Sequence, residues 1–450
     1  MAVSAARSVA FNILLRVEYE KSYAGELLHS LSSENLSPRD HGLATELVMG
    51  VLRWQSLLDQ RLAAVSSQKV ERLDEEVRTA LRLGVYQLQF LTRVPARAAI
   101  FESVELVKAA RKRSAASLVN AVLRKVAAAG ADDAFMQIHR SVGALALSQT
   151  AAHPAWLVER WSEQYGLESA RQICNHDQTV PRTSIYIHGD PADTVAASSE
   201  LAAAGVELAS GVLLSAARRV QGDVTTTRAY CEGRISIQDE ASQLVALLVG
   251  RGDRLLDCCA APGGKTSLLA RRNPHAKILA TELHPHRARL LQNLNRLPNV
   301  FVVAADARYL PLSLECTFDR ILVDVPCSGT GTLARNPEIK WRLRSEDLHD
   351  LQVRQVAILK SALARLAMGG RLVYSTCSLE REENESVVEA ALYGAQQFKI
   401  FDCKGELERM WQAGELNWTD IPSLLAGPFL RTIPGLHPCD GFFAAMIERN

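Results

Sequence analysis

Hydrophobic residues in the first 129 positions recur three or four apart, which is the spacing of one face of an α-helix. The repeat is clearest in residues 48–58, 77–88 and 119–126. Amphipathic helices of this kind bury their apolar faces against one another. The pattern therefore predicts an all-α helical bundle, which we assign to residues 1–130.

The pattern becomes mixed after residue 145. A helical repeat at residues 153–165 is followed by short apolar runs typical of strands and by a second helical stretch. The predicted strands are residues 183–188, 206–208, 212–214 and 233–239, and the second predicted helix is residues 191–204. We expect a small α+β domain of the RRM-like kind, which we assign to residues 145–232.

From residue 239 onward, short apolar runs alternate with amphipathic helical stretches. Strands are predicted at residues 254–256, 277–282, 300–306, 318–324 and 371–374, with helices at residues 286–297 and 345–368. Regular alternation of this kind is typical of a parallel, doubly wound α/β sheet. We therefore expect a multidomain chain that ends in a Rossmann-like α/β domain at residues 233–450.

The composition is that of a globular protein without a membrane segment. Of the 450 residues, 48% are hydrophobic and 22% are charged, which leaves room for about three domains of ordinary size. No stretch approaches the ~20 apolar residues of a membrane-spanning helix, and polar residues interrupt the N-terminal segment where a signal peptide would be apolar. The nine cysteines are an odd number without metal-type spacing. These features predict a cytoplasmic protein with no membrane contact and no metal.

Basic residues gather in two places, although the net charge of the chain is only +1. Residues 91–125 contain eight lysines or arginines against Glu102 and Glu105, and a second cluster surrounds Trp341. The second cluster consists of Arg335, Lys340, Arg342 and Arg344. An isolated basic cluster is most often a solvated helix face, but one beside a candidate active site favours contact with nucleic acid.

Two cysteines each follow a predicted strand in a short polar turn. Cys327 lies in residues 324–331 (DVPCSGTG) and Cys377 in residues 374–378 (YSTCS). Because the carboxyl ends of parallel strands share one edge of a sheet, we expect both thiols at a common site. A single cysteine is most often inert core packing. The flanking proline, serine, glycine and threonine favour a functional role for these two.

A third turn, residues 257–266 (DCCAAPGGKT), follows the first strand of the predicted sheet. It lacks the G-x-G-x-x-G spacing of dinucleotide-binding folds, and Cys259 occupies the place of the first glycine of a Walker A loop. Glu282 and Asp306 follow the next two strands. Acids there suit ribose hydroxyls and an adenine amine, whereas helix capping is the alternative for each acid alone. The arrangement indicates an adenosine-based cofactor, S-adenosylmethionine.

These three turns and residues 438–443 (PCDGFF) resemble the motifs of RNA cytosine-C5 methyltransferases. The N-terminal helical region resembles a NusB-like domain, most clearly over residues 94–124. Residues 238–242 (QDEAS) resemble the entry to the catalytic domain. This order of domains is similar to that of the small-subunit ribosomal RNA methyltransferase B (RsmB/Sun) family.

The resemblance implies a cofactor, a site and a mechanism. The cofactor is S-adenosylmethionine, bound by Cys259, Ala260, Ala261, Pro262, Gly263, Gly264, Lys265, Glu282, Asp306 and Asp324. The catalytic residues are Cys377, Cys327 and Asp324. Cys377 would add to carbon 6 of cytosine, Asp324 would bind the base, and Cys327 would help the carbon-5 proton to leave. Glu282 stands where an aspartate is common, and the role of Lys265 stays open between closing the pocket and starting a helix.

The implied substrate is small-subunit (16S) ribosomal RNA, either free or in an assembly intermediate. Its target cytosine must be unpaired or flipped out to reach a thiol. We expect a monomer whose helical and α+β regions bind RNA. Two alternatives stay open: methylation of transfer RNA by the same chemistry, and a non-catalytic RNA-binding assembly factor. A binder has no need of both Cys327 and Cys377 in intact turns.

Overall fold

The computed structural model describes residues 3–31, 36–130, 133–189, 191–313 and 315–450. The chain forms two compact units. The helical unit comprises Met1–Val180 and Leu333–Arg342, and the sheet unit comprises Pro181–Thr332 and Leu343–Asn450. None of the described helices is both long and apolar enough to cross a membrane. The predicted order, with helices first and an α/β sheet last, is confirmed.

The helical unit begins with a bundle of helices. They are α1 (Ala5–Tyr19), α2 (Ala24–Leu31), α3 (Pro38–Val65), α4 (Glu75–Phe90), α5 (Ala96–Ala109) and α6 (Ala116–Ala129). α3 begins where the Ser37 side chain accepts a hydrogen bond from the Asp40 amide and Pro38 fixes the first turn. Leu58 and Leu83, two of the apolar positions that predicted the bundle, are fully buried. The hydrophobic spacing therefore identified the packing faces.

Residues 134–177 form further helices, although the hydrophobic pattern predicts a small α+β domain from residue 145 onward. α7 (Ala134–Arg140), α8 (Ala144–Thr150), α9 (Ala155–Tyr165) and α10 (Leu167–Asp177) all belong to the helical unit. The pattern predicts only α9. α7 and α8 have seven residues each, which is too short for an apolar repeat to stand out. The domain boundaries at residues 130 and 145 stay a prediction.

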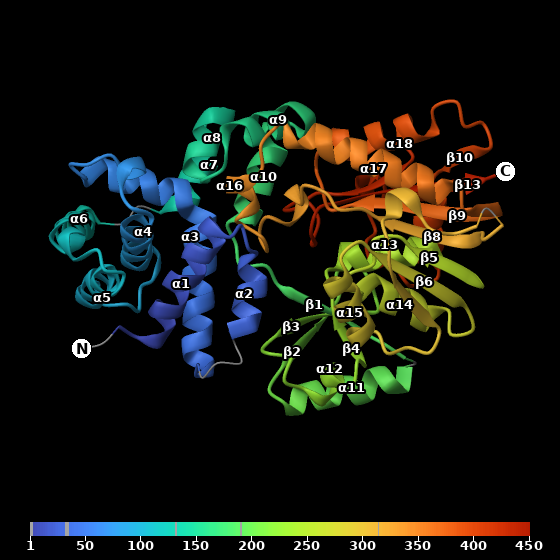
Figure 1. Ribbon diagram of the computed structural model, residues 1–450, viewed down its shortest axis with the longest axis horizontal. Coiled ribbons are helices and arrows are strands. Elements are labelled where there is room, and N and C mark those ends of the chain that lie inside the picture. Colours follow the sequence, from blue (N-terminus) through green and yellow to red (C-terminus); the bar gives the residue numbers. More distant parts are fainter. Residues whose placement is uncertain (1–2, 32–35, 131–132, 190, 314) are drawn as a thin grey trace. The chain divides into compact units, whose positions relative to one another are not determined.

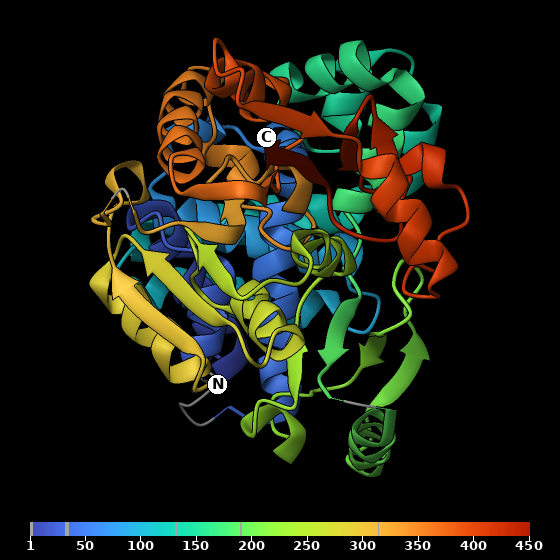
Figure 2. The same ribbon diagram turned by 90° about the vertical axis from the view of Figure 1, so that its right-hand side faces the viewer.

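The sheet unit opens with a small antiparallel sheet of strand order β2-β3-β1-β4. Its strands are β1 (Thr183–Ile187), β2 (Glu207–Ser210), β3 (Ala217–Gln221) and β4 (Ile235–Ile237), with α11 (Pro191–Ala203) on one side (Figure 2). Ile185, Ile187, Ala197 and Leu201 form a buried layer. The predicted small α+β fold is confirmed.

One predicted strand, residues 212–214, is wrong. The amides of these residues donate to the buried carboxylate of Glu240 at 3.2, 2.7 and 2.9 Å. Arg219 pairs with the same carboxylate at 3.1 Å. Because backbone amides need an acceptor when buried, Glu240 replaces the neighbouring strand that the apolar run predicted.

The larger sheet contains parallel strands in the order β9-β8-β5-β6-β7. These are β5 (Arg254–Asp257), β6 (Lys277–Glu282), β7 (Val300–Ala304), β8 (Phe318–Asp324) and β9 (Leu366–Thr376). Antiparallel strands continue it beside β9: β13 (Phe442–Arg449), β12 (Phe429–Thr432) and β11 (Leu425–Ala426), with β10 (Phe398–Phe401) paired to β13. The alternating pattern predicted the parallel strands and not the antiparallel ones.

Helices cover both faces of this sheet. They are α13 (Glu240–Val249), α14 (Gly264–Arg272), α15 (Pro285–Leu294), α17 (Asp347–Leu363) and α18 (Glu385–Leu392). Leu255 and Leu322 share a core with α13 and α14, whereas Leu256 and Val323 share the opposite core with α17 and α18. Successive residues of a strand point to opposite faces. The carboxyl ends of the strands are thus left to build a site.

A ten-residue segment from the second half of the chain is part of the helical unit. Leu333–Arg342, which contains α16 (Ile339–Arg342), lies among the N-terminal helices (Figure 1). We call it the anchor segment. Trp341 Nε1 donates to the carbonyl of Leu52 at 2.7 Å. The guanidinium of Arg342 donates to three backbone carbonyls within residues 17–22.

Lys340 corrects the interpretation of the basic cluster around Trp341. Its side chain is fully buried, and its Nζ donates to the carbonyls of Arg53 at 2.8 Å and Ala152 at 3.1 Å. Burial lowers the pKa of Lys340 to about 7, against the opposing charge of Asp177. The prediction that this cluster faces nucleic acid is wrong for Lys340, because its donors hold the anchor segment in the helical unit.

Lys340→Met should change how the stability of the protein depends on pH. The pKa of Lys340 is about 7 in the folded chain and 10.5 as the ordinary value. Between these values the unfolded chain binds a proton that the folded chain lacks, so the free energy of unfolding rises with pH. The rise is about 1.4 kcal/mol per pH unit at most. Methionine removes this contribution.

Denaturant unfolding at pH 7, 8 and 9 measures the effect as the difference in unfolding free energy between wild type and variant. That difference should grow with pH for Lys340→Met. Lys108→Met, at an exposed position of α5, is the control and should leave the pH dependence of the unfolding free energy as in the wild type. Equal slopes for wild type and Lys340→Met would contradict the titration of Lys340 in this window.

Candidate active site

The two predicted cysteine turns meet at one edge of the large sheet. Cys327 follows β8 and Cys377 follows β9, and these strands pair in parallel, with Asp324 opposite Ser375. The sulfurs lie 3.2 Å apart, and the Cys377 amide donates to the Cys327 sulfur at 3.3 Å. Both residues are half-buried. The strand pattern predicted this juxtaposition, which places two thiols within reach of one ligand atom.

The Cys327 thiol is held in its protonated form. A hydrogen bond with Cys377 and burial raise the pKa of the Cys327 thiol well above its usual value. The negative charges of Glu383 and Asp324 act in the same direction. The thiolate is the reactive form of cysteine, so these causes make Cys327 a poor nucleophile in this arrangement.

The C-terminal motif packs directly on the cysteine turns. The Gly331 amide donates to the carbonyl of Cys377 at 2.9 Å, and the Gly441 amide donates to the carbonyl of Gly331 at 2.8 Å. A Cβ atom at Gly331 would lie 2.2 Å from the carbonyl oxygen of Gly441. Only glycine fits this approach of two backbones. The motif at residues 438–443 is therefore a wall of the site.

Asp324 is oriented from two sides. Lys265 Nζ lies 2.7 Å from its Oδ2, and the Ser375 hydroxyl donates to its Oδ1 at 2.7 Å. Burial lowers the pKa of Lys265, but the charge and hydrogen bond of Asp324 raise it by more, so the net change is upward. Lys265 is thus a cation at the edge of the site, 5.1 Å from the ring centre of Phe442. It also lies in the first turn of α14, which is one of the two roles left open by the sequence, and its role in closing the pocket stays a prediction.

Three acids stand at the same edge of the sheet as the small-residue loop after β5. Glu282 ends β6, and Asp324 ends β8. Asp306 follows β7 and binds Arg308 through its carboxylate, and this pairing lowers the pKa of Asp306. Glu282 is nearly buried and accepts from the His284 amide at 3.0 Å. All three carboxylates stand at the carboxyl edge of the sheet.

Two buried acceptors border this loop and have no donor. They are Asp257 Oδ1 and Gln238 Oε1. Gln238 Oε1 lies 3.5 Å from the position that a Cβ atom of Gly264 would take, and burial raises the pKa of Asp257 to about 7. Buried polar groups are nearly always hydrogen-bonded. A ligand that carries an ammonium group or hydroxyls would supply donors here.

Glu383 is a buried residue of this site that sequence reasoning missed. It accepts hydrogen bonds from the Ser328 amide and from the Ser328 and Ser378 hydroxyls. The charged run at residues 380–385 is typical of a solvated turn, so nothing in its composition indicated burial.

Within the described ranges, no group of three His, Cys, Asp or Glu side chains is arranged to hold a metal ion.

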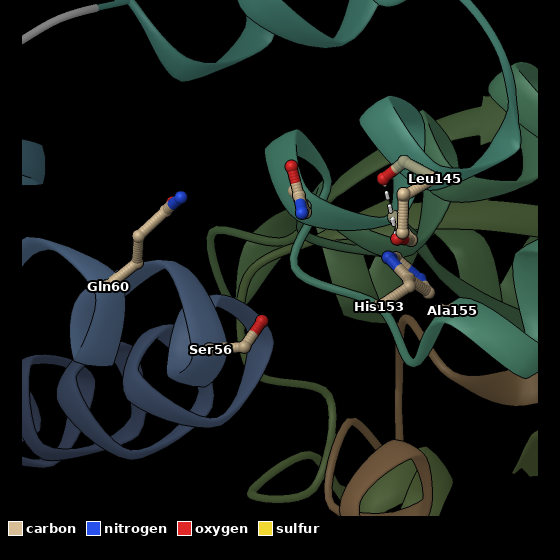
Figure 3. A pocket seen from close by; sticks show the side chains of 7 residues that line it. Ser56, Gln60, Leu145, His153 and Ala155 are labelled. Atoms are coloured by element: carbon tan, nitrogen blue, oxygen red, sulfur yellow. Dashed lines mark hydrogen bonds between the residues drawn. The ribbon is translucent and has the colours of Figure 1, made fainter.

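The helical unit contains a separate pocket of about 330 Å³. Figure 3 shows Ser56 and Gln60 of α3 on one side and Leu145 of α8 with His153 on the other. His153 is buried, and its Nε2 contacts Asp177 at 3.2 Å. Burial and the charge of Lys340 lower its pKa well below the usual value. His153 therefore serves the packing of the helical unit. None of the residues that line this pocket is a cysteine.

Three family models match successive parts of the chain. Residues 4–128 match the NusB family, residues 153–226 match the ferredoxin-like domain of RsmF/B-like methyltransferases, and residues 244–448 match 16S rRNA methyltransferase RsmB/F. These matches confirm the predicted classes of all three regions.

Similar proteins cover the whole chain. The chain is 34% identical, over the full length of both sequences, to a protein of Bacillus subtilis named probable ribosomal RNA small subunit methyltransferase B. The crystal structure of PH0851 matches the whole of both chains with a TM-score of 0.81 at 22% identity, a likeness of fold alone. The structure of a methyltransferase homologue from Pyrococcus horikoshii has a TM-score of 0.55 at 26% identity and covers 67% of this chain and 97% of its own.

Gly331→Ala should destabilise the sheet unit. The added methyl group would meet the backbone of Gly441, which cannot rotate away as a side chain can. Overpacking of this kind costs about 1–3 kcal/mol. Gly405→Ala in α19 (Cys403–Gln412) is the matched control, because no atom lies within 4 Å of the added Cβ and alanine is the better helix former.

Thermal unfolding compares the two variants. The midpoint should fall for Gly331→Ala and stay equal or rise for Gly405→Ala. A wild-type midpoint in Gly331→Ala would contradict the close approach of the two turns.

Proposed function

Because this chain belongs to the RsmB/F family of 16S rRNA methyltransferases, we propose that it methylates carbon 5 of one cytosine in small-subunit ribosomal RNA. The methyl donor in this proposal is S-adenosylmethionine. The observation that carries the proposal is the pair of thiols 3.2 Å apart at neighbouring strand ends. Such a pair suits a reaction in which one thiol bonds to the base and the other acts beside it.

The chemistry explains why a thiol is needed. Carbon 5 of cytosine belongs to an aromatic ring and is too weak a nucleophile to take a methyl group. A thiolate that adds to carbon 6 breaks the aromaticity and makes carbon 5 enamine-like, so one hard step becomes two easier ones. Cys377 is the proposed nucleophile, because its turn resembles the family motif that carries the nucleophile and the raised pKa of Cys327 makes that thiol a poor nucleophile.

Cys327 and Asp324 take the remaining roles. After methylation the carbon-5 proton must leave before the sulfur of Cys377 can be eliminated. Once Cys377 is bonded to the base, its thiol no longer raises the pKa of Cys327, so Cys327 as a thiolate, or a water molecule beside it, would take up the carbon-5 proton. Asp324, oriented by Lys265 and Ser375, would form a hydrogen bond with the ring nitrogen or the exocyclic amine of cytosine. Fixed groups of this kind stabilise charge that develops during the reaction.

The residues proposed to hold the cofactor fit its chemistry. Residues 259–265 would pass along it, and Glu282 and Asp306 would accept hydrogen bonds from its ribose hydroxyls and adenine amine. The unpaired acceptors of Asp257 and Gln238 support an ammonium group near the loop. When bound, S-adenosylmethionine supplies an electrophilic methyl group.

The RNA partner is proposed from the family and from the N-terminal regions. Residues 1–130 and 145–232 would bind structured RNA and bring an unpaired or flipped cytosine to the thiols. The protein would act as a cytoplasmic monomer on free RNA or an assembly intermediate. Transfer RNA is the alternative substrate. A non-catalytic assembly factor is the other alternative, and the close thiol pair argues against it.

Deleting the gene should remove one 5-methylcytosine from 16S ribosomal RNA. Bisulfite sequencing of total RNA measures this directly, because 5-methylcytosine resists the conversion that ordinary cytosine undergoes. The wild-type gene should restore the site, and a gene carrying Cys377→Ala should not. Loss of a site in transfer RNA would identify the alternative substrate, and loss of no site would contradict the proposal.

The two cysteine variants should differ in the covalent species that they leave. Cys377→Ala should abolish both methylation and any protein–RNA adduct, since no atom remains to attack carbon 6. Cys327→Ala should still permit attack but slow elimination, so an adduct should accumulate and survive denaturing electrophoresis. Cys231→Ala, at an exposed position, is the control and should behave as wild type. If Cys377→Ala traps RNA and Cys327→Ala does not, the roles are exchanged.

A further inference from the structure

One carboxylate joins the turns that carry the two thiols. Glu383 ends the 3₁₀ turn η5 (Arg381–Glu383) and is fully buried. Its Oε1 accepts from the Ser328 amide and from Gln355 Nε2, each at 2.8 Å. Its Oε2 accepts from the hydroxyls of Ser328 and Ser378. Ser328 directly follows Cys327, and Ser378 directly follows Cys377, so a single side chain fastens both turns.

The charge of Glu383 is held without a cation. Among the residues that the structure describes, no lysine, arginine or histidine pairs with this carboxylate, and four hydrogen-bond donors from Ser328, Ser378 and Gln355 surround it. A buried charge costs stability unless it is paired or hydrogen-bonded. An apolar side chain of similar size at this position would stabilise the fold about equally well. The placement of a carboxylate between the two thiol turns therefore indicates a use beyond folding.

The position of Glu383 is itself fixed. Its backbone carbonyl accepts from the Tyr374 hydroxyl at 2.6 Å. Tyr374 lies in β9, three residues before Cys377. The hydroxyls of Ser328 and Ser378 also lie 3.0 Å apart. Rotation of either turn would break several of these bonds together. The sulfur-to-sulfur distance thus depends on Glu383.

We infer that Glu383 is a positioning residue for the thiol pair, which holds the Cys327 and Cys377 sulfurs at the observed distance of 3.2 Å and keeps a negative charge beside Cys327. The inference rests on the proposed function for its catalytic meaning, and it goes beyond it by adding a residue and a role. The groups that face the Cys327 thiol are Cys377 from the turn after β9, Glu383 from η5 and Asp324 from β8.

Glu383→Gln tests the role, because glutamine has the same shape but one acceptor oxygen and a donating nitrogen. It removes the charge and replaces one of the two acceptor oxygens by a donor, so the groups that faced that oxygen must turn to accept or lose their hydrogen bond. We expect kcat for RNA methylation, and the rate of adduct formation in a Cys327→Ala background, to fall about tenfold to a hundredfold. KM for RNA and for S-adenosylmethionine should stay within twofold.

Glu385→Gln is the matched control. Glu385 lies two residues away and is paired with Arg431 at a part-buried position, without a hydrogen bond to either cysteine turn. It should leave kcat and adduct formation at the wild-type level even if it lowers the unfolding midpoint. Ser378→Ala provides a second variant if Glu383→Gln does not fold. It should lower kcat with KM unchanged.

Alkylation of the thiols by iodoacetamide, followed by mass spectrometry, gives a readout that needs no RNA. Removing the carboxylate charge should move the pH dependence of Cys327 alkylation toward lower pH. Unchanged alkylation together with unchanged kcat in Glu383→Gln would overturn the inference, as would a change in KM alone. If the wild-type protein forms no 5-methylcytosine but Glu383→Gln still shifts the alkylation profile, the proposed function fails and the positioning role stands.

Discussion

The parallel pairing of β8 with β9 is the constraint on which the site depends. Asp324 stands opposite Ser375 in this register, and each strand carries its cysteine a few residues further on. A slip of one residue would turn every side chain of a strand to the other face of the sheet. The register is specified from both faces, because Val323 and Tyr374 are buried in one core while Leu322 and Val373 are buried in the other. The thiols meet because burial of both faces of β8 and β9 in hydrophobic cores allows only this register.

Around that pairing, the turns of the site contact one another through their backbone atoms. Gly331 and Gly441 touch without side chains, and the Cys377 amide faces the Cys327 sulfur. Glycine, serine and threonine dominate these turns because larger residues would separate them. The small residues that made the turns recognisable in the sequence are thus the ones that allow them to converge.

The sequence predicted the parts of the structure that follow a local repeat. Helical spacing identified the N-terminal bundle, and alternating apolar runs identified β5 to β9 as parallel strands. The antiparallel strands beside β9 carry no such alternation with helices and were missed. The strand predicted at residues 212–214 failed because a distant carboxylate, Glu240, satisfies its amides. Within the site, the cysteines were evident from their turns, whereas Glu383 was hidden in a charged run whose burial is set by tertiary contacts.

The anchor segment has a consequence for the order in which the chain matures during synthesis. The helical unit needs Trp341 and Lys340, whose side chains donate to the carbonyls of Leu52, Arg53 and Ala152. Its continuous part ends at Val180, so a ribosome that adds ~5–20 residues per second needs roughly ten to thirty seconds more to reach the anchor. During that interval the nascent helices lack part of their interior. The first unit to emerge is therefore completed only after β5 to β8 and the Cys327 turn have been made, so the N-terminal helices mature later than their place in the sequence suggests.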